Sequence, residues 1–125
     1  MKMEKLGDTE FTIFSPAEVL EKVTNHEIVL IDVRTAAEYA FEHIAAALLF
    51  PMSIFDPANL PCQDSKPIVF HCGSGMRSAA IAKQCASAGI GKVAHMDGGF
   101  GAWKEAKLPY KGIDPHTGSL VLKNA

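Results

Sequence analysis

The sequence has 125 residues, of which 48% are hydrophobic and 21% charged, and its formal net charge is −2 at pH 7. A chain of this size and composition predicts one globular domain and excludes an intrinsically disordered segment. So small a net charge gives no general attraction for nucleic acid or an anionic membrane, and no apolar run is long enough to span a bilayer. We therefore expect neither a nucleic-acid partner nor a membrane partner.

The cysteine pattern favours free thiols. The chain has three cysteines, Cys62, Cys72 and Cys85. Their odd number and the absence of a C-x-x-C pair argue against a disulfide framework and a structural zinc site. The five histidines show no metal-ligand spacing, so we expect no metal. The charged first residues are not followed by the apolar core of a signal peptide, and we expect a cytoplasmic protein.

The N-terminal half alternates strand and helix patterns, which predicts an α/β fold. Ser15-Pro16-Ala17-Glu18 is a helix start, because it combines an N-cap serine, proline at the first position and a capping-box glutamate. The run 27–33 (EIVLIDV) is typical of a parallel strand buried on both faces. The expected elements are a short edge strand at 10–14, a helix to about Val23, a strand at 27–33, a helix at 36–43, a strand at 47–50, and a loop or single helical turn at 54–60.

The C-terminal half continues the alternation. It predicts a strand at 67–71, a polar turn at 72–77, a helix at 78–88 ended by Gly89, a strand at 92–96, a turn at 97–99 and a helix at 100–107. The tail carries one apolar patch, Leu120-Val121-Leu122, which would add an edge strand or contact a partner. We expect a single domain over residues 1–125 with its core at about 10–110 and a C-terminal tail at 111–125.

The residues that carry chemistry follow the strand at 67–71. Ligands in open α/β sheets bind beyond the carboxyl ends of strands, and Cys72 stands at such an end. Gly73 and Gly75 let the loop curl so that backbone N–H groups point inward, and such a nest at a helix N-terminus favours a thiolate. We expect the pKa of Cys72 to be lowered by this field and by Arg77, which makes Cys72 a candidate nucleophile. A cation at a helix N-terminus is unfavourable, so Arg77 itself is expected to have a function.

The length of the loop separates two chemistries. Cysteine phosphatases, both tyrosine-specific and arsenate-reducing, hold a tetrahedral oxyanion in a C-x5-R loop. Here the loop from Cys72 to Arg77 is C-x4-R, one residue shorter. The tighter cradle suits one sulfur atom bonded to the cysteine rather than a phosphate group.

Three stretches together resemble a single-domain rhodanese, a thiosulfate-type sulfurtransferase. They are Ile31-Asp32-Val33-Arg34 with Glu38-Tyr39 and His43-Ile44, the loop Cys72 to Ser78, and Asp97-Gly98-Gly99-Phe100 with Trp103. The resemblance implies a rhodanese-like α/β domain with a central, mainly parallel sheet of about five strands and helices on both faces. The chain departs from the family's usual pattern where Glu42 precedes His43 and three alanines follow Ile44, which would alter the rim of the substrate mouth.

The resemblance also implies a double displacement through a Cys72 persulfide. The donor would be thiosulfate or a low-molecular-weight persulfide, and the acceptor a thiol, or cyanide in vitro. The catalytic residues would be Cys72 and Arg77, and no metal or organic cofactor would be required. The persulfide-binding loop would comprise Gly73, Ser74, Gly75, Met76 and Ser78, and the supporting residues would be Asp32, Arg34 and His43. Of these, Asp32 and Arg34 are expected to form a structural ion pair or hydrogen-bond hub.

Other interpretations stay open at this point. One alternative is a rhodanese-like module that binds a protein partner without catalysis. The other is a small phosphatase or arsenate reductase on the related scaffold. Cys85 is expected to pack against the sheet and Cys62 to lie in a loop, where it is a weak candidate for a resolving thiol. His43 and His71 are expected to be core or rim residues, Trp103 a core residue, and the protein a monomer or homodimer.

Overall fold

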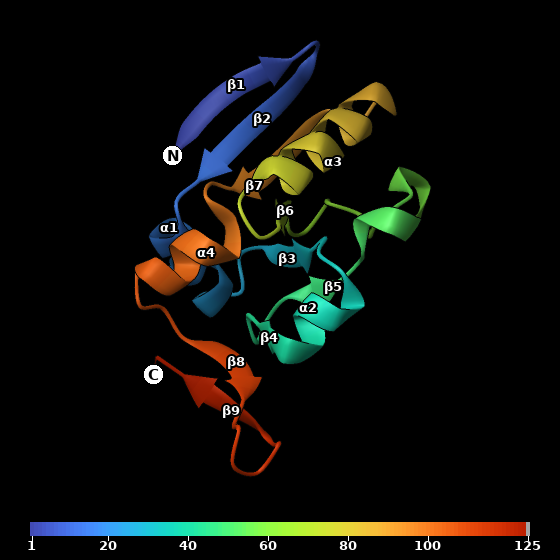
Figure 1. Cartoon of the computed structure of the whole chain (residues 1–125). Coiled ribbons are helices and arrows are strands. Elements are labelled where there is room, and N and C mark those ends of the chain that lie inside the picture. The colour runs from blue at the N-terminus through green and yellow to red at the C-terminus, as the bar shows by residue number, and fades with distance from the viewer. Residues whose placement is uncertain (125) are drawn as a thin grey trace.

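A computed structural model describes residues 1–124 of the chain. Its strands are β1 (Lys2–Leu6), β2 (Thr9–Phe14), β3 (Val29–Asp32), β4 (Glu42–His43), β5 (Leu48–Leu49), β6 (Ile68–His71), β7 (Lys92–Met96), β8 (Tyr110–Ile113) and β9 (Leu120–Lys123). Its α-helices are α1 (Pro16–Thr24), α2 (Ala36–Phe41), α3 (Met76–Ser87) and α4 (Gly99–Glu105). Six strands form the main sheet in the order β1-β2-β7-β6-β3-β5 (Figure 1). No helix among the described residues is long and apolar enough to cross a bilayer.

The main sheet is parallel except at one edge. Strands β2, β7, β6, β3 and β5 pair in parallel, and β1 pairs antiparallel with β2 through the turn at Gly7. The expectation of a mainly parallel sheet is therefore confirmed, with six strands instead of about five. The prediction that residues 10–14 form an edge strand was wrong, because β1 covers that edge.

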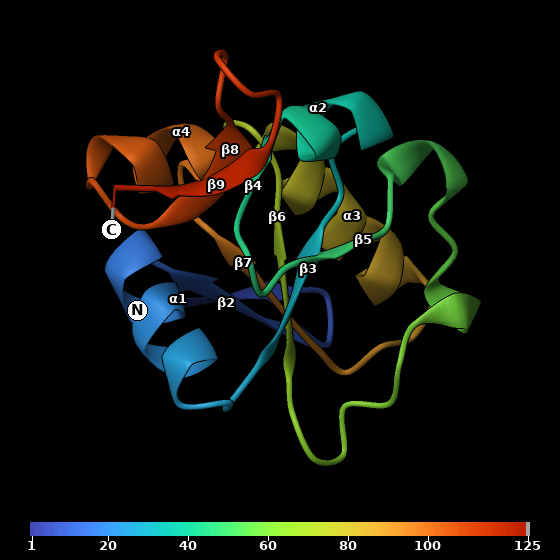
Figure 2. The ribbon, with the colours of Figure 1, turned by 90° about the horizontal axis from the view of Figure 1, so that it is seen from below.

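Helices cover both faces of the sheet, as expected (Figure 2). On one face, Val19 of α1 and Trp103 of α4 share a core cluster with Leu30 and Val69. On the other face, Ile81 and Cys85 of α3 share a second cluster with residues of β3 and β6. Successive strand residues alternate between the two clusters, so both faces are buried. This explains the near-continuous apolar strands of the sequence.

Capping boxes begin α1 and α2. Ser15 caps α1 through Glu18, as predicted, and Thr35 caps α2 through Glu38 in the same way. The helix expected at 36–43 ends at Phe41, because Glu42 and His43 have extended backbone and pair with β8. The expected strand at 47–50 is the two-residue β5. The segment expected at 54–60 contains two 3-10 turns, Met52–Ile54 and Pro57–Asn59.

The tail joins β4 in a second, antiparallel sheet with the order β4-β8-β9. Its apolar patch lies in β9, which pairs with β8 from Tyr110 to Ile113. Of the two expectations for this patch, the edge strand is confirmed. Figure 1 shows this small sheet at the end of the molecule that carries α2 and β4.

Candidate active site

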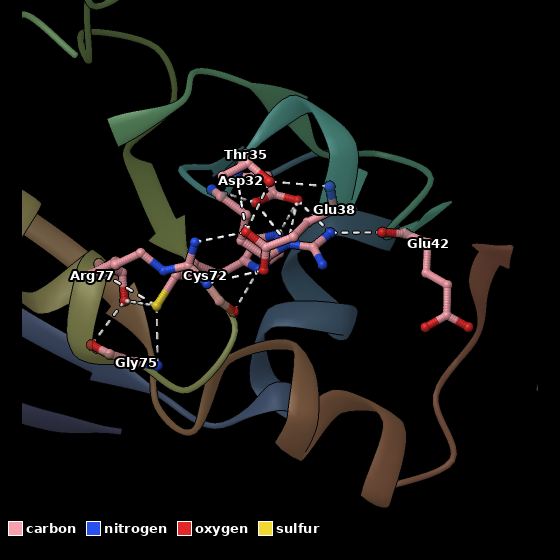
Figure 3. Close-up of polar contacts among 10 residues, drawn as sticks. Asp32, Thr35, Glu38, Glu42, Cys72, Gly75 and Arg77 are labelled. Carbon is pink, nitrogen blue, oxygen red and sulfur yellow. Dashed lines mark hydrogen bonds and ion pairs between the residues drawn. The ribbon is translucent and has the colours of Figure 1, made fainter. Parts of the chain in front are cut away.

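Cys72 lies where β6 passes into α3. It follows directly on His71, the last residue of β6, and its side chain is fully buried. Its Sγ accepts hydrogen bonds from the backbone N–H groups of Gly75 at 3.1 Å and Ser78 at 3.3 Å (Figure 3). Gly75, with φ of +102°, is the N-cap of α3 and offers no side chain of its own, so the sulfur occupies the acceptor position at the start of the helix.

This environment favours the thiolate. Burial by itself raises the pKa of Cys72, but hydrogen bonds with the backbone and hydroxyl of Ser78 and with the N–H groups of Gly75 and Ser74 outweigh it, and the pKa lies below that of an ordinary thiol. The direction agrees with the expectation, and the largest contributions come from the loop and Ser78 rather than from Arg77, which the expectation also named. The backbone N–H groups of the loop can therefore hold a sulfur anion at this position.

Arg77 pairs with Glu38 of α2. Its guanidinium binds both carboxylate oxygens of Glu38, at 2.8 and 3.1 Å, and so ties α3 to α2. This hydrogen bonding holds the pKa of Glu38 at about 2 and raises the pKa of Arg77, to which the charge on Cys72 also contributes. Arg77 thus has a charged partner outside its own helix, although its place at a helix N-terminus is unfavourable for a cation.

The first turn of α4 holds the loop from the other side. The N–H of Phe100 donates to the carbonyl of Cys72 at 2.7 Å, and the N–H of Gly101 donates to the carbonyl of Gly73 at 3.0 Å. Gly99 has φ of +61°, and a Cβ there would lie 2.6 Å from the carbonyl carbon of Gly73. Only glycine lets α4 approach this closely, which gives the Asp-Gly-Gly turn a structural reason.

Asp32 and Arg34 form a buried ion pair beside the loop. Arg34 Nη2 lies 2.8 Å from Asp32 Oδ2 and 2.7 Å from the carbonyl oxygen of Glu42, and its guanidinium stacks 4.6 Å from the ring centroid of Phe100. The pair therefore joins β3, β4 and α4, as the expected structural hub would. His71 lies between the pair and the loop, with Nε2 3.5 Å from Asp32 Oδ2 but without a hydrogen bond to it, and with Nδ1 3.4 Å from the carbonyl oxygen of Cys72.

The remaining predicted residues lie either on the exposed part of the loop or away from it. Ser74 and Met76 are exposed on the loop, and Met76 is 80% exposed. His43 is bound to α2 instead, because its Nδ1 lies 2.7 Å from the carbonyl of Tyr39 and its ring stacks on the Tyr39 ring. Cys85 and Trp103 are buried in the core as expected, and Cys62 is exposed.

Two residues of the site were not singled out from the sequence. Glu38 was quoted only as part of a signature, although it binds Arg77. His95, near the carboxyl end of β7, places Nδ1 2.8 Å from the Ser78 hydroxyl, which in turn lies 3.7 Å from Cys72 Sγ. Its place on a parallel strand next to β6 was a usable signal, since functional groups gather at the carboxyl ends of such strands.

Comparison with known proteins agrees with this architecture. The rhodanese-like domain model matches residues 15–106. The chain is 40% identical over 104 residues to the uncharacterized protein slr1261 of Synechocystis, covering 82% of this chain and 58% of that protein, less than two thirds of its length. It is 33% identical over 90 residues to thiosulfate sulfurtransferase GlpE of Coxiella burnetii, covering 72% of this chain and 84% of that protein.

A solved structure shows the same fold. The rhodanese-related protein of Thermoplasma volcanium superposes with a TM-score of 0.68 and 25% identity, over 79% of this chain and 96% of its own. The match to the family model, residues 15–106, includes β3, β6 and β7 and the whole loop from Cys72 to Ser78.

Proposed function

The chain belongs to the rhodanese-like domain family, and we propose that it acts as a sulfurtransferase that carries a sulfane sulfur on Cys72. The donor is thiosulfate or a low-molecular-weight persulfide, and the acceptor is a cellular thiol, for which cyanide substitutes in vitro. The observation that carries the proposal is the Cys72 sulfur at the N-terminus of α3, held by backbone N–H groups in a C-x4-R loop.

The reaction proceeds in two displacements. The Cys72 thiolate attacks the outer sulfur of the donor, the S–S bond of the donor breaks, and sulfite or a thiolate leaves with its electron pair. Cys72 then carries a persulfide. The acceptor thiolate attacks the outer sulfur of that persulfide, the bond to Sγ breaks, and the Cys72 thiolate is regenerated.

The loop supplies electrostatic stabilisation in both steps. The N–H groups of Gly75 and Ser78 point at the sulfur and stabilise its negative charge before and after transfer. Arg77 adds positive charge and, through Glu38, fixes the start of α3. Gly73, Ser74 and Met76 form the rim that a donor passes, and their small or apolar side chains admit a neutral persulfide as readily as an anion.

Intact-protein mass spectrometry before and after incubation with thiosulfate tests the proposal. We expect the wild type to gain one sulfur atom, Cys72→Ala to gain none, and the matched control Cys62→Ala to behave as the wild type. Circular dichroism establishes that both variants are folded. If thiosulfate gives no gain, glutathione persulfide is tried in the same way.

Failure of the folded wild type with both donors would overturn the proposal in favour of a non-catalytic binding module. Hydrolysis of p-nitrophenyl phosphate that depends on Cys72 would instead support a phosphatase. Either result is distinguished from misfolding by the same circular dichroism spectra.

A further inference from the structure

A hydrogen-bonded chain runs from Cys72 through Ser78 to His95. The Ser78 hydroxyl is fully buried, and its oxygen lies 3.7 Å from Cys72 Sγ, 3.2 Å from the Gly75 carbonyl oxygen and 2.8 Å from His95 Nδ1. His95 is 6% exposed. The shortest contact of the hydroxyl is thus with an imidazole that the mechanism has not yet used.

The hydroxyl has one hydrogen to share among these neighbours. If His95 Nδ1 carries no hydrogen, it accepts the hydrogen of Ser78, and none is directed at the sulfur. If Nδ1 carries a hydrogen, it donates to Ser78 Oγ, and the hydroxyl hydrogen is free to turn toward a negatively charged sulfur. Since a charged acceptor is preferred to a neutral carbonyl, a thiolate at Cys72 then receives this hydrogen bond.

We propose that His95 is a positioning residue which, through a hydrogen on Nδ1, orients the Ser78 hydroxyl toward the sulfur anion of Cys72. No bond is made or broken at His95. The inference deepens the proposed function, on which it rests, by naming the group that prepares Cys72 for attack on the donor sulfur.

The surroundings of His95 are consistent with a neutral ring at pH 7. Burial lowers its pKa, while the charges of Asp97, next to its own strand, and Glu4 of β1 act in the opposite direction. From β2 the neighbour is the Phe11 ring, whose centroid is 4.9 Å away, and β6 presents Phe70 in register. From α3 it faces Ser78, beyond which Cys72 is the titratable group. A neutral ring carries its hydrogen on either Nδ1 or Nε2, and a thiolate at Cys72 favours the tautomer with the hydrogen on Nδ1.

The test measures the reactivity of the Cys72 thiol and not the rate of sulfur transfer. The rate of Cys72 alkylation by iodoacetamide is followed against pH by peptide mass mapping in the wild type, His95→Phe, His95→Asn and Ser78→Ala. We expect the midpoint to rise by about one pH unit in Ser78→Ala, since a hydrogen bond to a charged group is lost. In His95→Phe we expect a smaller rise, because Ser78 keeps its hydroxyl but loses the donor that holds its oxygen in place. His95→Asn offers an amide donor near the position of Nδ1 and should restore a midpoint close to that of the wild type.

A purely structural role would not show this pattern. A wild-type midpoint in folded His95→Phe, or an equal rise in His95→Asn and His95→Phe, overturns the inference. Should His95→Phe fail to fold, ¹⁵N NMR of wild-type His95 decides, because a predominant Nε2–H tautomer with Cys72 ionised contradicts it and the Nδ1–H tautomer supports it. If Cys72 takes up no sulfur while its midpoint still depends on His95, the proposed function fails and the positioning role stands.

Discussion

At the scale of single residues, the three cysteines occupy three different environments. Hydrogen bonds to the buried Cys72 lower its pKa despite burial, whereas burial alone raises the pKa of Cys85 to about 11. Cys62 is exposed on a loop. One chain therefore contains a buried cysteine with a lowered pKa, the candidate nucleophile, and a buried cysteine with a raised pKa.

We predict that Cys72 is alkylated at lower pH in the folded protein than in the unfolded chain. Its folded pKa lies below the ordinary value of 9.0, so the thiolate persists as pH falls below the point at which an unfolded cysteine protonates. Peptide mass mapping after iodoacetamide treatment, with and without urea, measures both midpoints. Cys85 is the internal control, since its midpoint should shift the other way; a Cys72 midpoint that is equal or higher in the folded protein contradicts the prediction.

Glu38 should matter more for sulfur transfer than for stability. The pair with Arg77 is more than one third exposed on both sides, and such pairs contribute only about 0–1 kcal/mol to stability. We predict that Glu38→Gln lowers the free energy of unfolding by about 1 kcal/mol or less. Its initial rate of sulfuration should fall about tenfold, as expected when a group that fixes the loop is displaced.

Urea unfolding and time-resolved mass spectrometry give the two quantities for Glu38→Gln. The matched control is Glu42→Gln, which loses an ion pair with Lys104 but leaves the contacts of Arg77 unchanged. A control that is slowed as much as Glu38→Gln would show that the effect is not specific to the loop.

Sequence reasoning located the loop because its residues are contiguous and their types limit the chemistry. Cys72, Gly75, Arg77 and Ser78 all lie within one short segment at the end of a buried strand. Glu38 and His95 belong to separate elements. Glu38 is 39 positions from its partner Arg77 in the sequence, and His95 is 17 positions from its partner Ser78. Only the packing of α2 and β7 against the loop assigns them a part, and no local pattern encodes that packing.

At the scale of elements, α3 and α4 hold the loop between them. The sulfur caps α3, and the first turn of α4 binds the carbonyl groups of Cys72 and Gly73. The geometry of the sulfur site therefore depends on how closely α4 approaches, and Gly99 sets that distance.

We predict that Gly99→Ala disrupts the site. Its φ of +61° costs a non-glycine residue about 1–2 kcal/mol, and the added Cβ would also press on the backbone of Gly73. We expect a loss of stability of about 3 kcal/mol and loss of sulfuration. Gly89→Ala, with φ of +85° and no atom within 4 Å of its added Cβ, is the control and should lose about 1 kcal/mol while sulfuration persists. Equal effects of the two substitutions would refute the steric argument.

The buried parallel strands were the elements most readily predicted, because burial on both faces leaves a distinct apolar run. Strand β7 was predicted at its observed bounds, and β3 and β6 within a few residues. The missed strand, β1, is exposed along nearly its whole length and is held by pairing with β2, which a local apolar pattern does not reveal. The end of α2 was predicted two residues too late for a related reason. Glu42 and His43 form β4 only because they pair with β8, which is distant in the sequence.

At the scale of the whole molecule, the buried ionisable groups make stability depend on pH. His71 lies fully buried between Asp32 and the loop, and within residues 1–124 its Nε2 is the one buried side-chain nitrogen or oxygen without a hydrogen-bond partner. Burial lowers the pKa of His71 and of His95 below the ordinary value of 6.5. The folded protein therefore resists protonation that the unfolded chain accepts.

We predict that acid destabilises the protein in two successive pH ranges. Below about pH 6.5 the unfolded chain binds protons at His71 and His95 that the folded protein does not, so stability falls by up to about 1.4 kcal/mol per pH unit for each proton. The second range lies between pH 4.5 and about 2, where Glu18 and Glu38 are still ionised in the folded protein but protonated when unfolded. Urea unfolding at closely spaced pH values measures both ranges. His95→Asn should reduce the fall in stability in the first range, leaving the part due to His71, and should leave the second range unchanged. A wild type whose stability does not change between pH 7 and 5 would contradict the burial argument for both histidines.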